Sequence, residues 1–310
     1  MSKPNDLIIF STPDYAGLAE RLTQLLPVSE GALETRIFPD GERYLRLSSS
    51  VRQQNVVCLG GMNDDRATLD LYDLASAIVE QGARRLTLAV PYFGYSTMER
   101  ATVRGEAVVA KFRARLLSSI PHATARNTVM FFDLHSPGIP HYMENGLSAV
   151  HVRSFDLLAP HIKRLGGTDF VLGSTDAGRA KWVETMANEI GVEAAFILKR
   201  RRQDGHTEVL ALNARVEGRT VVIYDDMIRS GGSLLSAAKA YHQAGAKRLV
   251  AVTTHGLFTD GALDRLKQSG LFTSILCTDS HPEVSHNEHS DILEVISCAP
   301  AFAEEIRSLI

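Results

Sequence analysis

VVIYDDMIRSGGSLL, residues 221–235, is the stretch of this chain that decides its fold. Four apolar residues lead into two adjacent acids, and a Ser-Gly-Gly-Ser loop then leads into a helical pattern of apolar residues. A buried strand followed closely by an amphipathic helix is the repeating unit of a parallel α/β sheet. In that unit we expect Ser233 to cap the start of the helix and Gly245 to end it.

The loop between this strand and this helix predicts an anion site. Backbone N–H groups at the start of a helix favour negative charge, and the glycines let the backbone approach a phosphate closely. Asp225 and Asp226 cannot face that phosphate without repulsion, so we expect them to meet hydroxyls or a metal ion. A phosphate beside neighbouring hydroxyls describes a ribose phosphate. The alternative is an ordinary glycine-rich turn with acidic caps.

Composition restricts the class of protein. The chain has 310 residues, 45% hydrophobic content and a net charge of −3, which suits two globular domains without a basic field for nucleic acid. No run of about 18 apolar residues is present, so we expect no membrane span. The widely spaced Cys58, Cys277 and Cys298 are typical of core residues in a reducing compartment. We therefore expect a cytoplasmic protein with small-molecule ligands and with neither nucleic acid nor membrane as a partner.

The chain also repeats itself. Apolar runs alternate with helical patterns, including those at 68–81 and 103–119. GARRLTLAVPYFG from residue 82 is echoed by GAKRLVAVTTHG from residue 245, and VVCLGGMNDDRATL from residue 56 is echoed by the opening stretch. Two echoes in the same order indicate a duplication. The predicted fold class is α/β, with two duplicated doubly wound parallel-sheet domains, and only the second copy keeps the phosphate loop.

The opening stretch resembles the phosphoribosyl-diphosphate binding motif shared by type I phosphoribosyltransferases and ribose-phosphate diphosphokinases. Five further stretches occur in the order found in the diphosphokinases: FPDGE at 38–42, PYFGY at 91–95, DLH at 133–135, STDAG at 174–178 and KRR at 199–201. A type I transferase would usually be a single domain without the first three. The chain is therefore identified as a member of the ribose-phosphate diphosphokinase, or phosphoribosyl-diphosphate synthetase, family.

This resemblance implies two domains of type I phosphoribosyltransferase-like fold. Residues 1–153 would provide nucleotide and subunit contacts, and residues 154–310 would provide the ribose 5-phosphate loop and a catalytic hairpin. The last residues would pack back on the first domain. The resemblance also implies a homo-oligomer built from dimers, a hexamer being one such form, with ATP sites shared between subunits.

The implied reaction transfers the β,γ-diphosphoryl group of ATP to the C1 hydroxyl of ribose 5-phosphate, giving phosphoribosyl diphosphate and AMP, with Mg²⁺ as cofactor. This activity belongs to nucleotide biosynthesis. The implied metal ligands are His135 and Asp176. The residues implied for binding ribose 5-phosphate are Asp225, Asp226, Arg229, Ser230, Gly231, Gly232 and Ser233.

The turn FPDGE places an aromatic ring, two carboxylates and a flexible glycine together, a combination able to stack on a base and accept its amino hydrogens. The alternative is a plain Pro-Asp-Gly turn between strands. By resemblance the turn contacts the ATP adenine, from a neighbouring subunit. The nucleotide contacts implied in all are Phe38, Asp40, Gly41, Glu42, Thr97, Met98, Arg100 and His135.

The basic run KRRR at 199–202 is followed by QDGH, a turn signal, and by the strand pattern TEVLAL at 207–212. This order predicts a hairpin with cations at its base. A mobile hairpin of this kind would neutralise a phosphoryl group in flight and exclude water, whereas the alternative is a solvated surface run. By resemblance Lys199 and Arg201 are the catalytic pair.

Three stretches depart from the family pattern. Thr97 and Met98 stand where most members have an arginine and a glutamine that touch ATP, which leaves the nucleotide preference open. Arg229 stands where many members have an aspartate that holds ribose. The sequence after DLH also differs, so regulation by phosphate or ADP is not carried over. Two other functions remain: a regulatory homologue without catalysis, and a phosphoribosyltransferase that consumes phosphoribosyl diphosphate.

A cluster of histidines at 281–289 invites a metal interpretation. The spacing of His281, His286 and His289 matches no common metal site, and the surrounding residues are typical of a loop. We therefore predict no metal there.

Overall fold

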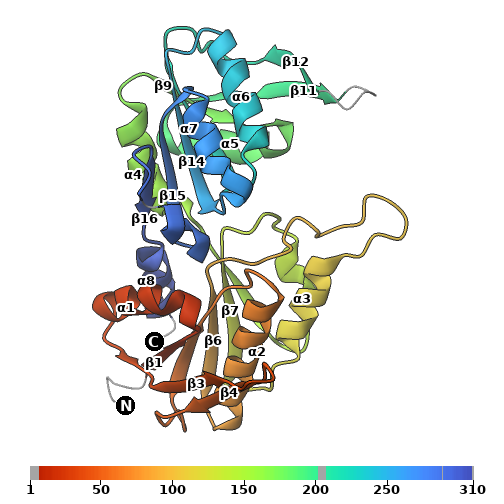
Figure 1. The fold of residues 1–310 in the computed structure, drawn as a ribbon, viewed down its shortest axis with the longest axis vertical. Coiled ribbons are helices and arrows are strands. Elements are labelled where there is room, and N and C mark those ends of the chain that lie inside the picture. Colours follow the sequence, from red (N-terminus) through yellow and green to blue (C-terminus); the bar gives the residue numbers. More distant parts are fainter. Residues whose placement is uncertain (1–6, 202–206, 288, 309–310) are drawn as a thin grey trace. The chain divides into compact units, whose positions relative to one another are not determined.

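The computed structural model describes residues 7–201, 207–287 and 289–308, and for residues 177, 198–201 and 207–211 it describes the backbone alone (Figure 1). The chain divides into two compact units. The first unit consists of Met1–Arg153 together with Cys298–Ile310, and the second consists of Ser154–Ser297.

The first unit is built on a six-stranded parallel sheet in the order β2-β1-β5-β6-β7-β8. The central strands are almost wholly buried, as the continuous apolar runs predict. The strands of this sheet are β1 (Leu7–Ser11), β2 (Ser29–Glu30), β5 (Asn55–Leu59), β6 (Arg85–Val90), β7 (Arg126–Phe132) and β8 (Ser148–Val152).

The second unit contains a sheet of the same design, in the order β10-β9-β13-β14-β15-β16, again with parallel pairs. Its strands are β9 (Phe170–Ser174), β10 (Glu193–Ala195), β13 (Thr220–Ile228), β14 (Arg248–Gly256), β15 (Phe272–Thr278) and β16 (Leu293–Ile296). The two strand orders are identical once the strands are counted within each unit. The expected duplicated α/β fold is thereby confirmed.

An antiparallel hairpin is inserted at the same point of both units, after the second strand of the sheet. In the first unit it pairs β3 (Leu33–Ile37) with β4 (Arg43–Leu47), and in the second it pairs β11 (Ile197–Arg201) with β12 (Thr207–Leu212). The apolar run AAFILKR at 194–200 is divided between β10 and β11. The turn FPDGE and the basic run KRR therefore occupy equivalent hairpins of the two copies.

Helices cover both faces of each sheet, which explains why the strands are apolar on both sides (Figure 1). In the first unit α2 and α3 pack on one face, and α1 and α8 contribute to the other, where the rings of Phe132 and Phe302 lie 5.6 Å apart. In the second unit α6 and α7 pack on one face, and α4 and α5 pack on the other. The helices are α1 (Ala16–Leu25), α2 (Asp65–Glu80), α3 (Val109–Ser118), α4 (Phe155–Gly166), α5 (Ala180–Ile190), α6 (Gly232–Gln243), α7 (Ala262–Gln268) and α8 (Ala299–Ser308).

Two helix boundaries differ from the sequence expectation for local reasons. Helix α2 begins at Asp65 rather than residue 68, because the carboxylate of Asp64 accepts a hydrogen bond of 2.7 Å from the N–H of Ala67 and caps the helix. Helix α3 begins only at Val109, because Gly105 has a φ of +94° and the chain before it forms turns.

Candidate active site

The candidate site lies where the strand order of the second sheet reverses. Strands β9 and β13 are neighbours, but the next strand after β9 lies on one side of the pair and the next after β13 lies on the other. Ligand sites of open α/β sheets form at such a switch point, beyond the carboxyl ends of the strands. The two ends meeting there carry residues 174–176 and the acids of the opening stretch.

Asp225 and Asp226 form a nearly buried acid pair, with side chains 15% and 5% exposed. The hydroxyl of Thr175 donates a hydrogen bond of 2.9 Å to Asp225 Oδ2. Arg179 Nη2 lies 2.6 Å from Asp226 Oδ1, and its Nε lies 3.8 Å from Asp225 Oδ1. Burial, and then the negative charge of Asp226, raises the pKa of Asp225 to about 8. The pair therefore resists two full negative charges and gains from a ligand that donates hydrogen bonds.

The loop after β13 turns sharply and leaves its donors accessible. Helix α6 begins at Gly232, and its N-cap is Gly231 with a φ of +74°, so the expectation that Ser233 caps the helix is wrong. A left-handed cap costs little only for glycine, which is why the cap falls there. Ser230, Gly232 and Ser233 are exposed. Arg265 Nη2 donates a hydrogen bond of 3.1 Å to the carbonyl oxygen of Ser230 and holds the loop from outside.

A tyrosine of α6 donates hydrogen bonds to the carboxyl ends of two strands. The hydroxyl of Tyr241, on α6, lies 3.0 Å from the carbonyl oxygen of Ser174 and 2.9 Å from that of Ala195. A Cβ atom at Gly173 would lie 2.9 Å from the Tyr241 ring, so glycine is needed at that point of β9. Helix α6 thus connects the loop at 230–233 to the strand that precedes Asp176.

Asp176 and Arg229 occupy different environments in this unit. Asp176 is exposed, and its Oδ1 accepts hydrogen bonds of 2.8 Å from the N–H of Gly178 and 3.3 Å from that of Arg179. It caps the single 3-10 turn Ala177–Arg179. Arg229 is exposed and forms no ion pair within the described part of the chain.

The basic run lies along the first strand of the second hairpin. The pair Ile197–Leu212 closes the base of the hairpin, and Arg201–Thr207 is the last pair before its loop. Lys199 and Arg201 therefore lie toward the loop end, and the expectation of cations at the base is wrong. The reason is that β11 begins at Ile197, two residues before the first cation, Lys199. Their side chains, Arg202 and the turn expected at 203–206 lie outside the described residues.

The equivalent hairpin of the first unit ends in the FPDGE turn. The N–H of Gly41 donates to the carbonyl oxygen of Phe38 at 2.9 Å, and the N–H of Phe38 donates to that of Glu42 at 2.8 Å. Asp40 Oδ1 accepts from the N–H of Glu42 at 3.0 Å. The segment is a turn between β3 and β4, and the carboxylate of Asp40 is partly used to build it.

An exposed aromatic cluster stands at this turn. The Phe38 ring is edge-on to that of Tyr44, with centroids 6.4 Å apart. The guanidinium of Arg36 lies over both rings, at 4.9 Å and 4.5 Å. Phe38 remains 38% exposed, so a planar ligand can reach it.

The segment after PYFGY lies at the surface. Tyr95 has a φ of +59°, and the N–H of Met98 donates to its carbonyl oxygen at 2.8 Å. Thr97 is half-buried, and Met98 is 40% exposed. Arg100 is 78% exposed and lies 3.5 Å from Glu99, which leaves its guanidinium accessible.

His135 follows β7 in a turn that sequence reasoning did not fully explain. Asp133 is buried with a φ of +46°, and the N–H of Leu134 donates to Nε2 of His151 at 3.2 Å. Burial lowers the pKa of His151, against the opposing charge of Asp133, so the ring stays neutral and can accept. His135 itself is half-buried.

The described carboxylates and histidines do not form a ready-made metal cage. No group of three or more His, Cys, Asp or Glu side chains within the described ranges is arranged to hold an ion. His135 belongs to the first unit and Asp176 to the second. Mg²⁺ commonly binds through one or two carboxylates, waters and substrate phosphates. The exposed carboxylate of Asp176 fits that mode of binding.

The corresponding switch point of the first unit is filled by side chains. The buried hydroxyl of Tyr15 donates to Asn63 Oδ1 at 2.8 Å, and a Cβ atom at Gly61 would lie 2.1 Å from that hydroxyl oxygen. The cap of the following helix is the carboxylate of Asp64, which occupies the N–H group of Ala67 and places a negative charge where a phosphate would bind. The first copy therefore lacks the features of an anion site at this junction.

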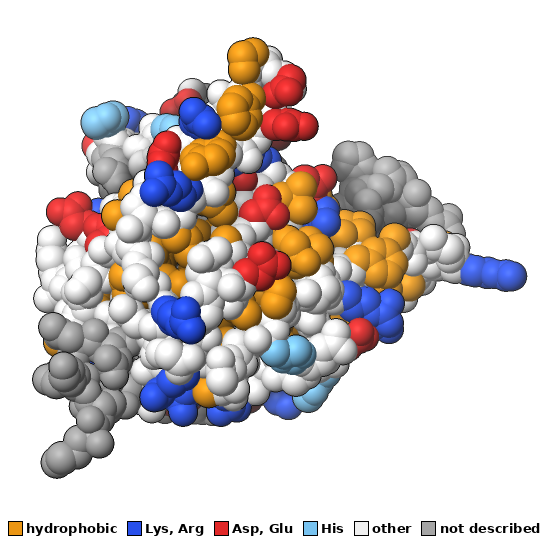
Figure 2. Space-filling model, turned by 90° about the horizontal axis from the view of Figure 1, so that it is seen from below, with side chains coloured by type: hydrophobic (Ala, Val, Ile, Leu, Met, Phe, Trp, Pro, Cys, Tyr) orange, Lys and Arg blue, Asp and Glu red, His pale blue; other side chains and the backbone are white. Residues whose placement is uncertain are grey.

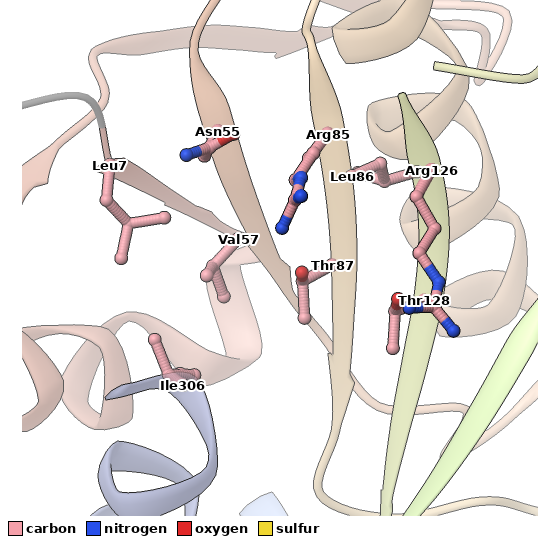
Figure 3. A pocket seen from close by; sticks show the side chains of 9 residues that line it. All are labelled: Leu7, Asn55, Val57, Arg85, Leu86, Thr87, Arg126, Thr128 and Ile306. Carbon is pink, nitrogen blue, oxygen red and sulfur yellow. The ribbon is translucent and has the colours of Figure 1, made fainter. Parts of the chain in front are cut away.

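A separate pocket lies at the amino ends of the strands of the first sheet (Figure 3). Arg85, Arg126 and Asn55 are first residues of their strands, and Ile306 of α8 closes one side. Arg126 Nη2 donates to the hydroxyl of Ser148 at 2.9 Å. Because this pocket is at the amino ends of the strands, it is distinct from the edge where such sheets bind their ligands.

The duplicated sheet, with an acid pair and a glycine loop at one switch point, defines a two-domain α/β protein with a candidate ligand site in its second unit. Comparison with known proteins specifies it further: residues 7–120 match the N-terminal domain of ribose phosphate pyrophosphokinase, and residues 186–310 match the phosphoribosyl synthetase-associated domain. The chain belongs to the ribose-phosphate pyrophosphokinase family.

Individual relatives agree with this assignment. The chain is 31% identical over 305 residues to ribose-phosphate pyrophosphokinase of Prochlorococcus marinus, with 97% of this chain and 89% of the relative covered. It is 32% identical over 273 residues to that of Saccharolobus solfataricus, with 87% and 91% covered. The crystal structure of phosphoribosylpyrophosphate synthetase from Mycobacterium smegmatis superposes with a TM-score of 0.88 at 27% identity, covering 98% of both chains.

Four residues of these sites were missed by sequence reasoning: Thr175, Arg179, Arg265 and His151. Arg179 follows the STDAG stretch directly, so its position beside a site motif was a usable signal. The role of Arg265 had no local signal, because it depends on the packing of α7 beside the loop. In the described helices, none is long and apolar enough to span a membrane.

Proposed function

We propose that this chain transfers the β,γ-diphosphoryl group of ATP to the C1 hydroxyl of ribose 5-phosphate, giving phosphoribosyl diphosphate and AMP. The C1 hydroxyl gives up its proton to water as its oxygen forms a bond to the β-phosphorus; the bond from that phosphorus to the α,β-bridging oxygen breaks, and AMP leaves with that oxygen. The observation that carries the proposal is the exposed loop at 230–233 beside the buried acid pair.

Ribose 5-phosphate would bind with its two ends in different environments. The 5-phosphate would be held by the N–H groups and hydroxyls at the start of α6, where the helix dipole favours an anion. The ribose hydroxyls would donate to Asp225 and Asp226, whose burial makes each such hydrogen bond valuable. The exposed Arg229 would add positive charge near the phosphate end.

ATP would be held by the first unit. The exposed ring of Phe38 offers a stacking surface, and Asp40, Gly41 and Glu42 shape the turn that presents it. Arg100 offers an accessible guanidinium for phosphates. Further contacts are proposed for Thr97, Met98 and His135.

Catalysis would rest on positioning and charge. Lys199 and Arg201, which are separated by Arg200 in the sequence of β11, are the proposed catalytic cations. Cations there would stabilise the charge that develops on the transferred group. Asp176 and His135 are each proposed to bind Mg²⁺, which would supply further charge neutralisation beside the phosphates.

The first unit also offers surface for a second copy of the chain. In the described residues the exposed large hydrophobic side chains all belong to this unit: Leu25, Ile37, Phe38, Leu69, Met98, Val103 and Phe112. Figure 2 shows hydrophobic side chains reaching the surface at several places, mixed with charged ones. We propose a cytoplasmic homo-oligomer based on dimers in which this unit makes the contacts.

The proposal is tested by incubating the purified protein with ribose 5-phosphate, ATP and Mg²⁺ and following AMP and phosphoribosyl diphosphate by chromatography. Equal amounts of the two products are expected, and Lys199→Ala should abolish both. Lys247→Ala, an exposed lysine at the amino edge of the sheet, is the matched control and should stay active. Absence of both products with ATP, ADP and GTP would contradict the proposal, and consumption of phosphoribosyl diphosphate with a base would indicate a transferase instead.

A further inference from the structure

Arg179 is the cation closest to the acid pair in the described contacts, and nothing in the sequence motifs assigns it a role. Its Nη2 lies 2.6 Å from Asp226 Oδ1, and its Nε lies 3.8 Å from Asp225 Oδ1. The guanidinium thus lies within ion-pair distance of both carboxylates. Only 12% of the side chain is exposed, so its charge acts with little screening by solvent.

The backbone fixes Arg179 in this position. Asp176 caps the 3-10 turn through the N–H groups of Gly178 and Arg179, and α5 begins at the next residue, Ala180. Arg179 is therefore set between a capped turn and a helix, which limits the directions that its side chain can take. Thr175, directly before Asp176, donates to the other side of Asp225.

We propose that Arg179 is the built-in counter-ion of the acid pair, and that it positions Asp225 and Asp226 to accept the ribose hydroxyls without a divalent cation at that point. The inference rests on the proposed function, since it concerns the ribose end of the same site. The negative charge of an acid pair this deeply buried needs a positive charge beside it. A planar guanidinium supplies that charge and leaves other carboxylate lone pairs for ligand hydroxyls.

The opposite role is physically distinct. Arg179 could instead close the site and have to leave before ribose enters, in which case its removal would strengthen binding. A positioning counter-ion gives the reverse result, because its removal leaves the negative charge of the buried pair uncompensated, and the pair then binds the ribose hydroxyls less well or recruits a metal ion. The sign of the change in affinity therefore separates the two roles.

The experiment is isothermal titration calorimetry of the full-length protein with ribose 5-phosphate, first in EDTA and then with Mg²⁺, in the absence of nucleotide. The wild type is expected to bind equally well in both. Arg179→Met should weaken binding in EDTA by about 10-fold or more, the usual loss for a charged hydrogen bond, with partial recovery in Mg²⁺. Arg179→Lys, which keeps the charge, should retain most of the affinity.

Arg215→Met is the matched control, because Arg215 is 85% exposed and lies 3.9 Å from Glu217 in the same unit. If Arg179→Met does not fold, as judged by thermal unfolding, Arg179→Lys and the double variant Arg179→Met/Asp226→Asn carry the test. Wild-type binding that requires Mg²⁺, absent binding in both buffers, or tighter binding by Arg179→Met overturns the inference. Failure of the proposed reaction shows itself separately, as binding without formation of AMP.

Discussion

The N–H of Leu134 donates a hydrogen bond of 3.2 Å to Nε2 of His151. His151 lies on β8, which pairs with β7, the strand that precedes His135. A protonated imidazole cannot accept this bond. Burial lowers the pKa of His151 below 6.5, so the unfolded chain takes up its proton first as the pH falls. This histidine therefore couples the shape of the 133–135 turn to pH.

The first prediction concerns this coupling. The free energy of unfolding should fall as the pH is lowered through 6.5, because the unfolded state then binds more protons at His151 than the folded state. His151→Gln should flatten the dependence of the free energy of unfolding on pH. The measurement is urea unfolding at a series of pH values from about 5 to about 8. His122→Gln is a control in the same unit. An unchanged slope in His151→Gln would contradict the prediction.

Asp225 should give a dependence of the opposite sign. Its pKa is about 8 in the folded chain against an ordinary 3.8, so between these values the folded state binds the extra proton. Raising the pH through that window should lower the free energy of unfolding. Asp225→Asn should remove this part of the slope, and Asp264→Asn, an exposed acid, should leave it unchanged. Equal slopes in wild type and Asp225→Asn would rule the assignment out.

Gly231→Ala should distort the loop at 230–233, the proposed site of the 5-phosphate. A left-handed φ of +74° costs a non-glycine residue about 1–2 kcal/mol, and the new Cβ would lie 3.3 Å from Leu266. We expect a lower melting temperature together with a higher KM for ribose 5-phosphate. Gly17→Ala, in α1 with open space around it, should instead stabilise the protein by about 0.5–1 kcal/mol. A Gly231→Ala protein with unchanged KM would argue against the loop as the phosphate site.

Phe38→Ala tests the stacking surface. Because Phe38 is 38% exposed at a hairpin tip, stability should change little, whereas the KM for ATP should rise by about tenfold, a typical loss for a base that stacks on an aromatic ring. Phe112→Ala, at a residue 50% exposed on α3, is the matched control for loss of a surface aromatic. A change in stability with no change in KM would assign Phe38 to the hairpin alone.

Sequence reasoning predicted the sheets well, because buried parallel strands have continuous apolar sequences, such as those of β5 and β13. The duplication was visible for the same reason. The N-cap of α6 was assigned wrongly, since a left-handed glycine and a serine both suit that position on sequence grounds. Arg179 was missed because its partners lie 46 and 47 residues further along the chain, and only the pairing of β9 with β13 brings them together.

The return of α8 to the first unit has a consequence for synthesis of the chain. Phe302 and Ile306 are buried there, and Arg307 Nη2 donates to the carbonyl oxygen of Leu25 at 2.8 Å. Domains generally fold as units while the ribosome extends the chain from its amino end. The second unit is contiguous, so it can be complete once residue 297 has emerged. The half that is translated first must therefore wait for the last helix before its own core is closed.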